Sequence, residues 1–124
     1  MHAITTEHAP AAIGPYSQAV AHESFVFTSG QLGIDPSSGQ MAADVTTQAE
    51  RSISNIEAIL NQEGLDLSNV IKTTVYLADI NDFAAVNEVY GRRFPAPHPA
   101  RSAFQVAALP AGGLVEIEAI AARR

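Results

Sequence analysis

The sequence contains no cysteine, which excludes disulfide bonds, thiolate nucleophiles and cysteine-ligated zinc or iron–sulfur centres. Basic residues are also scarce: Lys and Arg number 7 against 13 Asp and Glu, for a formal net charge of −6. Sites for nucleic acid or polyphosphate neutralise phosphates with clustered cations, so we expect neither ligand. No apolar run is long enough to span a bilayer and the N-terminus lacks a basic segment followed by an apolar run, so we expect a cytosolic protein without a membrane partner.

Recognisable motifs for metals and phosphates are absent as well. The histidines form no i, i+4 pair, so we expect no metal site; they are His2, His8, His22 and His98. No phosphate-binding glycine loop and no serine elbow occurs, which removes the usual nucleotide and acyl-transfer interpretations.

The 124 residues suit a single domain, residues 1–124. Apolar residues make up 47% of the chain and charged residues only 16%. A small domain with this ratio is expected to leave apolar surface uncovered, which favours oligomerisation.

Two segments have helical periodicity. The first runs from Val45 to Glu63, with Asp44 or a capping box of Thr47 and Glu50 at its start and Gly64 after its end. The second precedes Pro95 and carries an apolar stripe formed by Phe83, Val86, Tyr90 and Phe94.

Strands are predicted at residues 25–28, 70–77, 102–107 and 115–121, with a turn at 35–39 that favours a hairpin. Alternation places Ile71, Thr73, Val75 and Leu77 on one face of 70–77. The order ββ-α-β-α-ββ predicts an α+β fold, a mixed sheet with both helices on one face. The other face carries carboxylates beside apolar residues, which suits an intersubunit surface.

Two kinds of charged side chain are candidates for chemistry. Arg101 follows a proline-rich, extended segment, and its planar guanidinium suits bidentate binding of a carboxylate; a structural ion pair or an exposed arginine is the alternative. Glu116 and Glu118 share one strand face, where a partly desolvated carboxylate can orient water or exchange protons; a solvated face is the alternative.

Four further positions are candidates for ligand contacts. Ser29 and Gly30 can present a hydroxyl and a backbone N–H to an anion, although a turn explains them equally well. Tyr16 can line a pocket or an interface. Asn87 interrupts the apolar register of the second helix and is expected to face inward, where it needs a partner from the backbone or a ligand.

Several stretches along the whole chain resemble the RidA (reactive intermediate deaminase A) group of the YjgF superfamily. They are Ala12–Ala19, Thr28–Gln31, Asp44-Val45 with Gln48-Ala49, Lys72–Tyr76, Asn81–Phe83, Pro99–Ser102 and Val115–Ala121. The resemblance implies a chorismate-mutase-like homotrimer whose sheets form a central β-barrel, with a ligand cleft at each subunit interface. It also implies that Arg101 binds the substrate carboxylate and that Glu116 positions the attacking water. Residues matching Tyr16, Ser29, Gly30 and Asn87 line or border the family's cleft.

The implied reaction is hydrolysis of 2-iminobutanoate or 2-iminopropanoate, released by pyridoxal-phosphate-dependent dehydratases, to 2-keto acids and ammonia without a cofactor. Two departures from the family pattern are present. Ala103 stands where many members have cysteine, a harmless change if only its backbone carbonyl holds the water. The link from Tyr90 to Arg101 is shorter than in familiar bacterial members, which predicts a different cleft rim.

Two other classes of function stay open at this level. A non-catalytic trimer that binds small carboxylates such as 2-keto acids would retain Arg101 as well. Ribonuclease and chaperone activities have been attached to the family; the acidic balance disfavours the first, and the second would need an exposed apolar surface.

Overall fold

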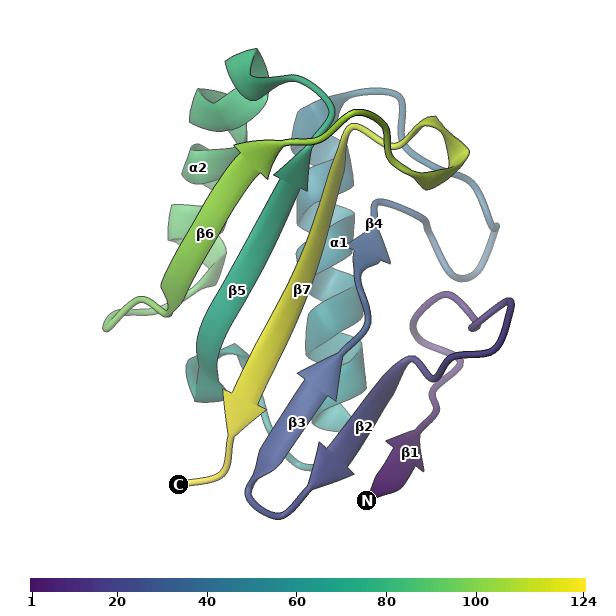
Figure 1. The fold of residues 1–124 in the computed structure, drawn as a ribbon, viewed down its shortest axis with the longest axis vertical. Helices are drawn as coiled ribbons and strands as arrows, with labels where there is room; N and C mark the ends of the chain where they lie inside the picture. The colour runs from purple at the N-terminus through teal and green to yellow at the C-terminus, as the bar shows by residue number, and fades with distance from the viewer.

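The structure, a computed structural model, describes residues 1–124 as a mixed seven-stranded sheet with two helices packed on one face (Figure 1). The strands are β1 (His2–Ile4), β2 (Ala19–His22), β3 (Phe25–Thr28), β4 (Gln31–Leu32), β5 (Val70–Leu77), β6 (Ala100–Gln105) and β7 (Val115–Ala122). The helices are α1 (Val45–Asn61) and α2 (Phe83–Arg93). The α+β class and the placement of both helices on one face are confirmed.

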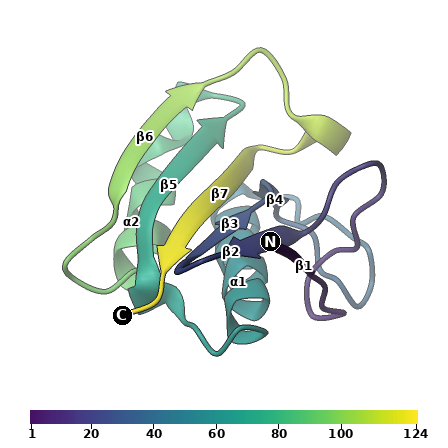
Figure 2. The same ribbon diagram turned by 60° about the horizontal axis from the view of Figure 1, so that its bottom comes forward.

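The strand order is β1-β2-β3-β7-β5-β6, with β4 also paired to β7. Only β5 and β6 are parallel, and the other pairs are antiparallel. Figure 2 shows β5 between β6 and β7, so the last two strands of the chain do not pair with each other. The segments on either side of the turn at 35–39 form only one isolated bridge, between Ile34 and Met41, and not the hairpin that was predicted. The outer strands β1 and β2 were not predicted, because they are short and rich in alanine and histidine.

The core lies between the sheet and the helices and contains 23 buried apolar residues. Helix α1 begins where Asp44 accepts a hydrogen bond from the Thr47 amide at 2.9 Å, so Asp44 is the cap and the alternative box with Glu50 does not form. The helix ends two residues earlier than expected, before Gly64, whose φ of 72° suits glycine. Neither helix is long and apolar enough to cross a membrane.

A polar stripe on α1 fixes the irregular backbone around β4. The Ser52 hydroxyl donates to the Gln31 carbonyl at 2.7 Å, and the Asn55 amide donates to the carbonyls of Leu32 and Ile34 at 3.2 and 3.0 Å. Gly33 lies so close to α1 that a Cβ there would approach the backbone of the helix to 2.4 Å. These contacts satisfy buried polar groups and hold β4 firmly on the helix.

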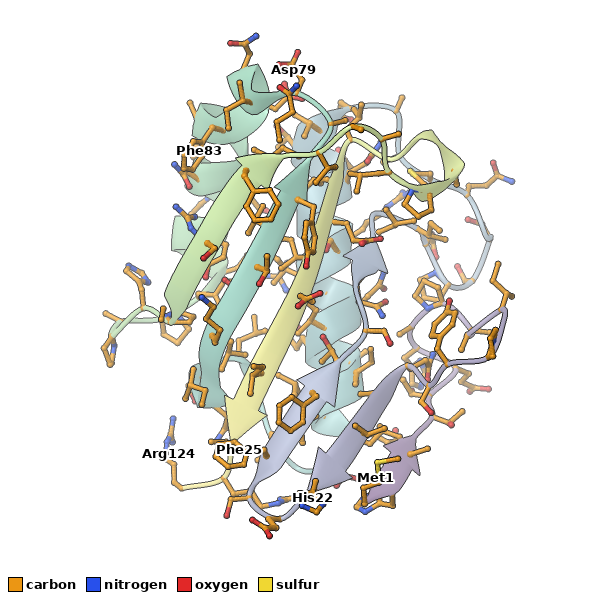
Figure 3. The ribbon with its side chains drawn as sticks, viewed as in Figure 1. Met1, His22, Phe25, Asp79, Phe83 and Arg124 are labelled. Carbon is orange, nitrogen blue, oxygen red and sulfur yellow. The ribbon has the colours of Figure 1, made fainter.

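The face of the sheet away from the helices is open in the protomer (Figure 3). Large apolar side chains are exposed on it, between 39% and 47% of their surface: Phe25, Phe27, Ile71 and Phe104. Ile71 was predicted to share a face with Thr73, Val75 and Leu77; a register shift between Val70 and Lys72 reverses the alternation at the start of β5 and separates Ile71 from them. The open face is therefore apolar at several positions and acidic at others, as the sequence indicated.

Candidate active site

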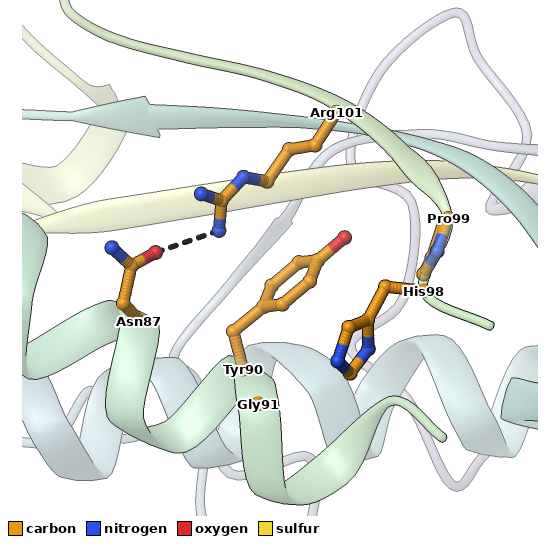
Figure 4. Close-up of a pocket in the computed structure, with 6 residues that line it drawn as sticks. All are labelled: Asn87, Tyr90, Gly91, His98, Pro99 and Arg101. Carbon is orange, nitrogen blue, oxygen red and sulfur yellow. Dashed lines mark hydrogen bonds between the residues drawn. The ribbon is translucent and has the colours of Figure 1, made fainter. Parts of the chain in front are cut away.

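Arg101 lies at the edge of the sheet, on the side that faces the helices. Its register partner on β5 is the buried Thr73, and its side chain extends toward α2 (Figure 4). The guanidinium donates a hydrogen bond to Asn87 Oδ1 at 2.7 Å. Its central carbon lies 4.7 Å from the ring centroid of Tyr90 and 5.3 Å from that of Phe83. Arg101 is thus held entirely by neutral groups.

A pocket of about 360 Å³ opens beside this guanidinium. Its lining is Asn87, Tyr90, Gly91, His98, Pro99 and Arg101. Arg101 forms no salt bridge, whereas Arg93 on α2 pairs with Glu50 and Glu57 at 2.8 and 3.3 Å. The positive charge of Arg101 therefore remains available to an anionic ligand, and the structural ion pair considered for Arg101 is absent.

Asn87 was expected to face inward, and this expectation is wrong. The residue is exposed, because it follows the buried Val86 and lies at the margin of the apolar stripe. Its partner is the Arg101 side chain and not the backbone. The polar interruption in the helix pattern therefore marks the position that contacts Arg101.

Glu116 projects from β7 toward the open face of the sheet, half-buried. Desolvation by burial, followed by the negative charge of Glu118, raises the pKa of the Glu116 carboxyl above its ordinary value. Glu118 accepts a hydrogen bond from the Tyr76 hydroxyl at 2.9 Å. A carboxyl with a raised pKa can exchange a proton with water closer to neutral pH.

Gly30 and Glu116 lie in direct contact. A Cβ on Gly30 would come within 2.7 Å of Glu116 Oε1, so only glycine leaves the carboxylate its place. Both residues line a pocket of about 560 Å³ together with Tyr16. The sequence interpretation of Gly30 as a point of close approach is right, and the group that approaches it is the carboxyl side chain of Glu116.

Strands β3 and β4 both pair with β7, and the ladder is interrupted between them at Ser29 and Gly30. At the break the Thr28 hydroxyl accepts a hydrogen bond from the Ala119 amide at 3.0 Å. The Ser29 hydroxyl donates to the Ser17 carbonyl at 2.6 Å, so in the protomer it supports the loop before β2. Ser29 lines a hollow separate from the Glu116 pocket.

One buried side chain holds the loop that carries Tyr16. The Gln18 amide donates to the carbonyls of Thr6, Ala9 and Pro10 at 3.0, 3.2 and 2.8 Å, and its oxygen accepts from the Thr6 amide at 2.8 Å. Gln18 itself is only 4% exposed. This clamp replaces regular secondary structure and fixes Tyr16 at the rim of the Glu116 pocket.

Five of the seven predicted site residues therefore fall into two groups within one protomer, and Ser29 and Ala103 belong to neither. Arg101 and Asn87 meet on the helix side of the sheet, and we call this group the arginine half-site. Tyr16, Gly30 and Glu116 line one pocket that opens on the other side, and we call this group the glutamate half-site. The two pockets share no residue. The Arg101 side chain extends toward α2, whereas the Glu116 side chain points to the open face of the sheet.

Ala103 belongs to neither half-site in the protomer. It lies on β6 two residues after Arg101, and its side chain packs against the core. Its predicted role depends on its backbone carbonyl, which a side-chain replacement leaves in place.

Sequence reasoning did not assign Tyr90, His98, Gly91 and Pro99 to the arginine half-site. Tyr90 was interpreted as a core residue, and it is indeed buried. The signal that was available is the spacing of Phe83, Asn87 and Tyr90, which places all three on one stripe of α2 facing β6.

The fold and the half-sites define a class: a small α+β protein that presents an uncompensated arginine and a half-buried glutamate. The family model described as endoribonuclease L-PSP matches residues 6–123. The 2-iminobutanoate/2-iminopropanoate deaminase of the goat, Capra hircus, is 58% identical over 119 residues, which cover 95% of this chain and 87% of that protein.

Two solved structures agree with this match. RidA from an Antarctic Psychrobacter species superimposes with a TM-score of 0.97 at 47% identity, covering 99% of this chain and all of that one. Escherichia coli TdcF with bound serine gives a TM-score of 0.96, also at 47% identity, with both chains covered in full. The chain belongs to the RidA family, also named YjgF or L-PSP.

Proposed function

We propose that this chain hydrolyses 2-iminobutanoate and 2-iminopropanoate to the corresponding 2-keto acids and ammonia. The observation that carries the proposal is Arg101, a fixed guanidinium with neutral neighbours and an open pocket beside it. Such a group suits the carboxylate that every 2-imino acid presents. Relatives named as deaminases of these imines, at 54–58% identity over 95% of the chain, support the same substrate class.

We further propose that the active protein is a homotrimer with a central β-barrel and a cleft at each interface. The arginine and glutamate half-sites lie in separate pockets of one protomer, so a small ligand contacts both only if two subunits contribute. The exposed apolar residues of the open face supply surface that assembly would cover.

In the proposed reaction Arg101 binds the carboxylate and orients the imine carbon toward a water held by Glu116 and the Ala103 carbonyl. Glu116 accepts a proton from the water while the water oxygen attacks the imine carbon, and Glu116 passes that proton to the imine nitrogen to give the neutral carbinolamine. Glu116 then accepts the proton of the carbinolamine hydroxyl as the carbonyl forms and delivers it to the nitrogen, which leaves as ammonia. Carbon is neither oxidised nor reduced, so positioning and proton transfer suffice without a cofactor.

The roles of the remaining contacts follow from the same arrangement. Tyr16 and Ser29 would close the rim of the cleft, Gly30 would leave room for the Glu116 carboxylate, and Asn87 would steady Arg101. Hydrogen-bond donors stabilise the tetrahedral intermediate most when they are already in position before the reaction.

The test couples a threonine or serine dehydratase to semicarbazide, which traps the released imine. Wild-type protein should lower the trapped fraction, whereas Arg101→Ala and Glu116→Ala should leave it unchanged. Arg101→Lys, which keeps the charge but loses the planar fork, should act weakly. An unchanged trapped fraction with wild-type protein would refute the deaminase proposal.

The second candidate is a non-catalytic binder of small carboxylates. A family structure, that of TdcF, contains serine, an amino acid with a carboxylate, and this favours the candidate. Binding of 2-ketobutyrate by a wild-type protein that leaves the imine decay rate unchanged would support this second function.

A further inference from the structure

The Arg101 guanidinium rests on an aromatic shelf, which we define as the rings of Phe83 and Tyr90. The ring centroids lie 5.3 and 4.7 Å from the guanidinium carbon, within the range in which a cation is attracted to the face of a ring. Asn87 lies between the two aromatics in sequence and adds the hydrogen bond of 2.7 Å. One stripe of α2 therefore provides all three contacts.

The Tyr90 ring is itself fixed by contacts that do not involve Arg101. Its hydroxyl shares a hydrogen bond of 2.6 Å with the hydroxyl of Thr73, the register partner of Arg101 on β5. The ring of Phe94 lies 4.4 Å away, and Tyr90 is only 5% exposed. The sheet therefore determines the position of both the arginine and the ring beneath it.

The shelf holds the guanidinium without neutralising its charge. Burial raises the pKa of Tyr90 above its ordinary value, while the Thr73 hydrogen bond and the Arg101 charge act in the opposite direction. The phenol therefore stays neutral near pH 7. A carboxylate in the same place would pair with Arg101 and compete with an anionic substrate, whereas a ring face restricts motion and leaves the N–H groups free.

We propose that Tyr90, assisted by Phe83, is a positioning residue that fixes the Arg101 fork for the substrate carboxylate. The substrate part of this inference rests on the proposed function. The ordering of the guanidinium by the ring does not, because it follows from contacts within the protomer.

The experiment compares Tyr90→Leu with Tyr90→Phe. Both lose the hydroxyl that bonds Thr73, but only the phenylalanine keeps the ring under Arg101. Val89→Ala serves as the control for general loss of packing, since Val89 is buried on the same helix and lies outside the arginine half-site. Circular dichroism and gel filtration verify that each variant folds and assembles as the wild type does.

Two readouts are measured: calorimetric binding of 2-ketobutyrate and the NMR signal of Arg101 Nε–H. Tyr90→Leu should bind 2-ketobutyrate about 2- to 30-fold more weakly, the range expected when a cation loses a ring face. Its KM in the imine assay should rise by a similar factor, with kcat changed less, because Arg101 binds substrate and transition state alike. Tyr90→Phe and Val89→Ala should match wild type.

The outcomes separate this inference from the proposed function. Wild-type binding without turnover would refute the deaminase reaction, and the order of the variants in binding would still decide the role of Tyr90. If the wild-type protein does not bind 2-ketobutyrate, the NMR signal of Arg101 Nε–H tests the role of Tyr90. Tyr90→Leu should make the Arg101 side chain more mobile, and Tyr90→Phe should not. Equal behaviour of the Leu and Phe variants would overturn the inference.

Discussion

Two inactive variants should restore activity when their subunits are mixed. Arg101→Ala removes the arginine half-site and leaves the glutamate half-site intact, and Glu116→Ala does the reverse. If each cleft takes Arg101 from one subunit and Glu116 from its neighbour, a mixed ring contains some clefts with both wild-type residues. We therefore expect activity to appear only after the two variants share trimers.

The size of the recovery follows from the geometry of a ring. In an equal, random mixture, a cleft receives an intact arginine with a probability of one half and an intact glutamate with a probability of one half. About a quarter of all clefts, and thus about a quarter of wild-type activity, should return in a ring with head-to-tail interfaces. Each mixed trimer has one such cleft, whichever variant is in the majority.

The assay mixes the variants with different affinity tags, by co-expression or by joint refolding, and measures imine hydrolysis of the whole mixture and of the doubly tagged fraction. Every trimer in the doubly tagged fraction is mixed, so about a third of wild-type activity is expected there. The same variants combined after folding, without exchange of subunits, are the control and should stay inactive. Recovery absent from verified mixed trimers would refute the shared cleft. That result would mean that Arg101 and Glu116 of the same subunit act on one substrate, although they line separate pockets in the protomer.

Three further predictions concern single residues. Burial and, to a smaller extent, the charge of Glu118 raise the pKa of Glu116, so the Glu116 carboxylate is protonated as pH falls through that raised pKa. Glu118→Gln should therefore lower the pKa of Glu116 and shift the acid limb of the kcat/KM–pH profile to lower pH. An unshifted limb would contradict this coupling. Gly30→Ala should displace the Glu116 carboxylate and lower kcat/KM about tenfold to a hundredfold with little change in Tm, and wild-type kinetics would show that the contact does not matter. Gln18→Ala, which deletes four hydrogen bonds of a buried amide, should lower the free energy of unfolding by about 2 to 4 kcal/mol in urea titrations; Gln62→Ala, at an exposed helix end, is the control.

The sequence was most informative where local chemistry determines the structure. Helix α1 starts at Asp44 and β5 runs from Val70 to Leu77 as predicted, because a capping side chain and a β-branched run act over neighbouring residues. The placement of Glu116 and Glu118 on one face of β7 was also predicted, and the alternate residues on the opposite face are buried. These features depend only on capping and on patterns among neighbouring residues.

The sequence was less informative where distant segments meet. The insertion of β5 between β6 and β7 depends on which strand edges remain free after folding, and local patterns do not encode it. The bulge that exposes Ile71 likewise arises from pairing with β7. For the site, Arg101 was identified from its chemistry, but its support by Tyr90 required the register between β5, β6 and α2.

The interruption of the ladder at Ser29 and Gly30 has a consequence for the evolution of substrate range. A residue within a regular strand is constrained by the face against which its side chain packs and by the register of the partner strand, whereas a residue at a break in the ladder lacks the second constraint. The Thr28 hydroxyl holds one end of the break on β7, and the Ser52 hydroxyl on α1 holds the other end at the Gln31 carbonyl. Lineages can therefore vary the lining of the Glu116 pocket while the rest of the sheet is inherited unchanged.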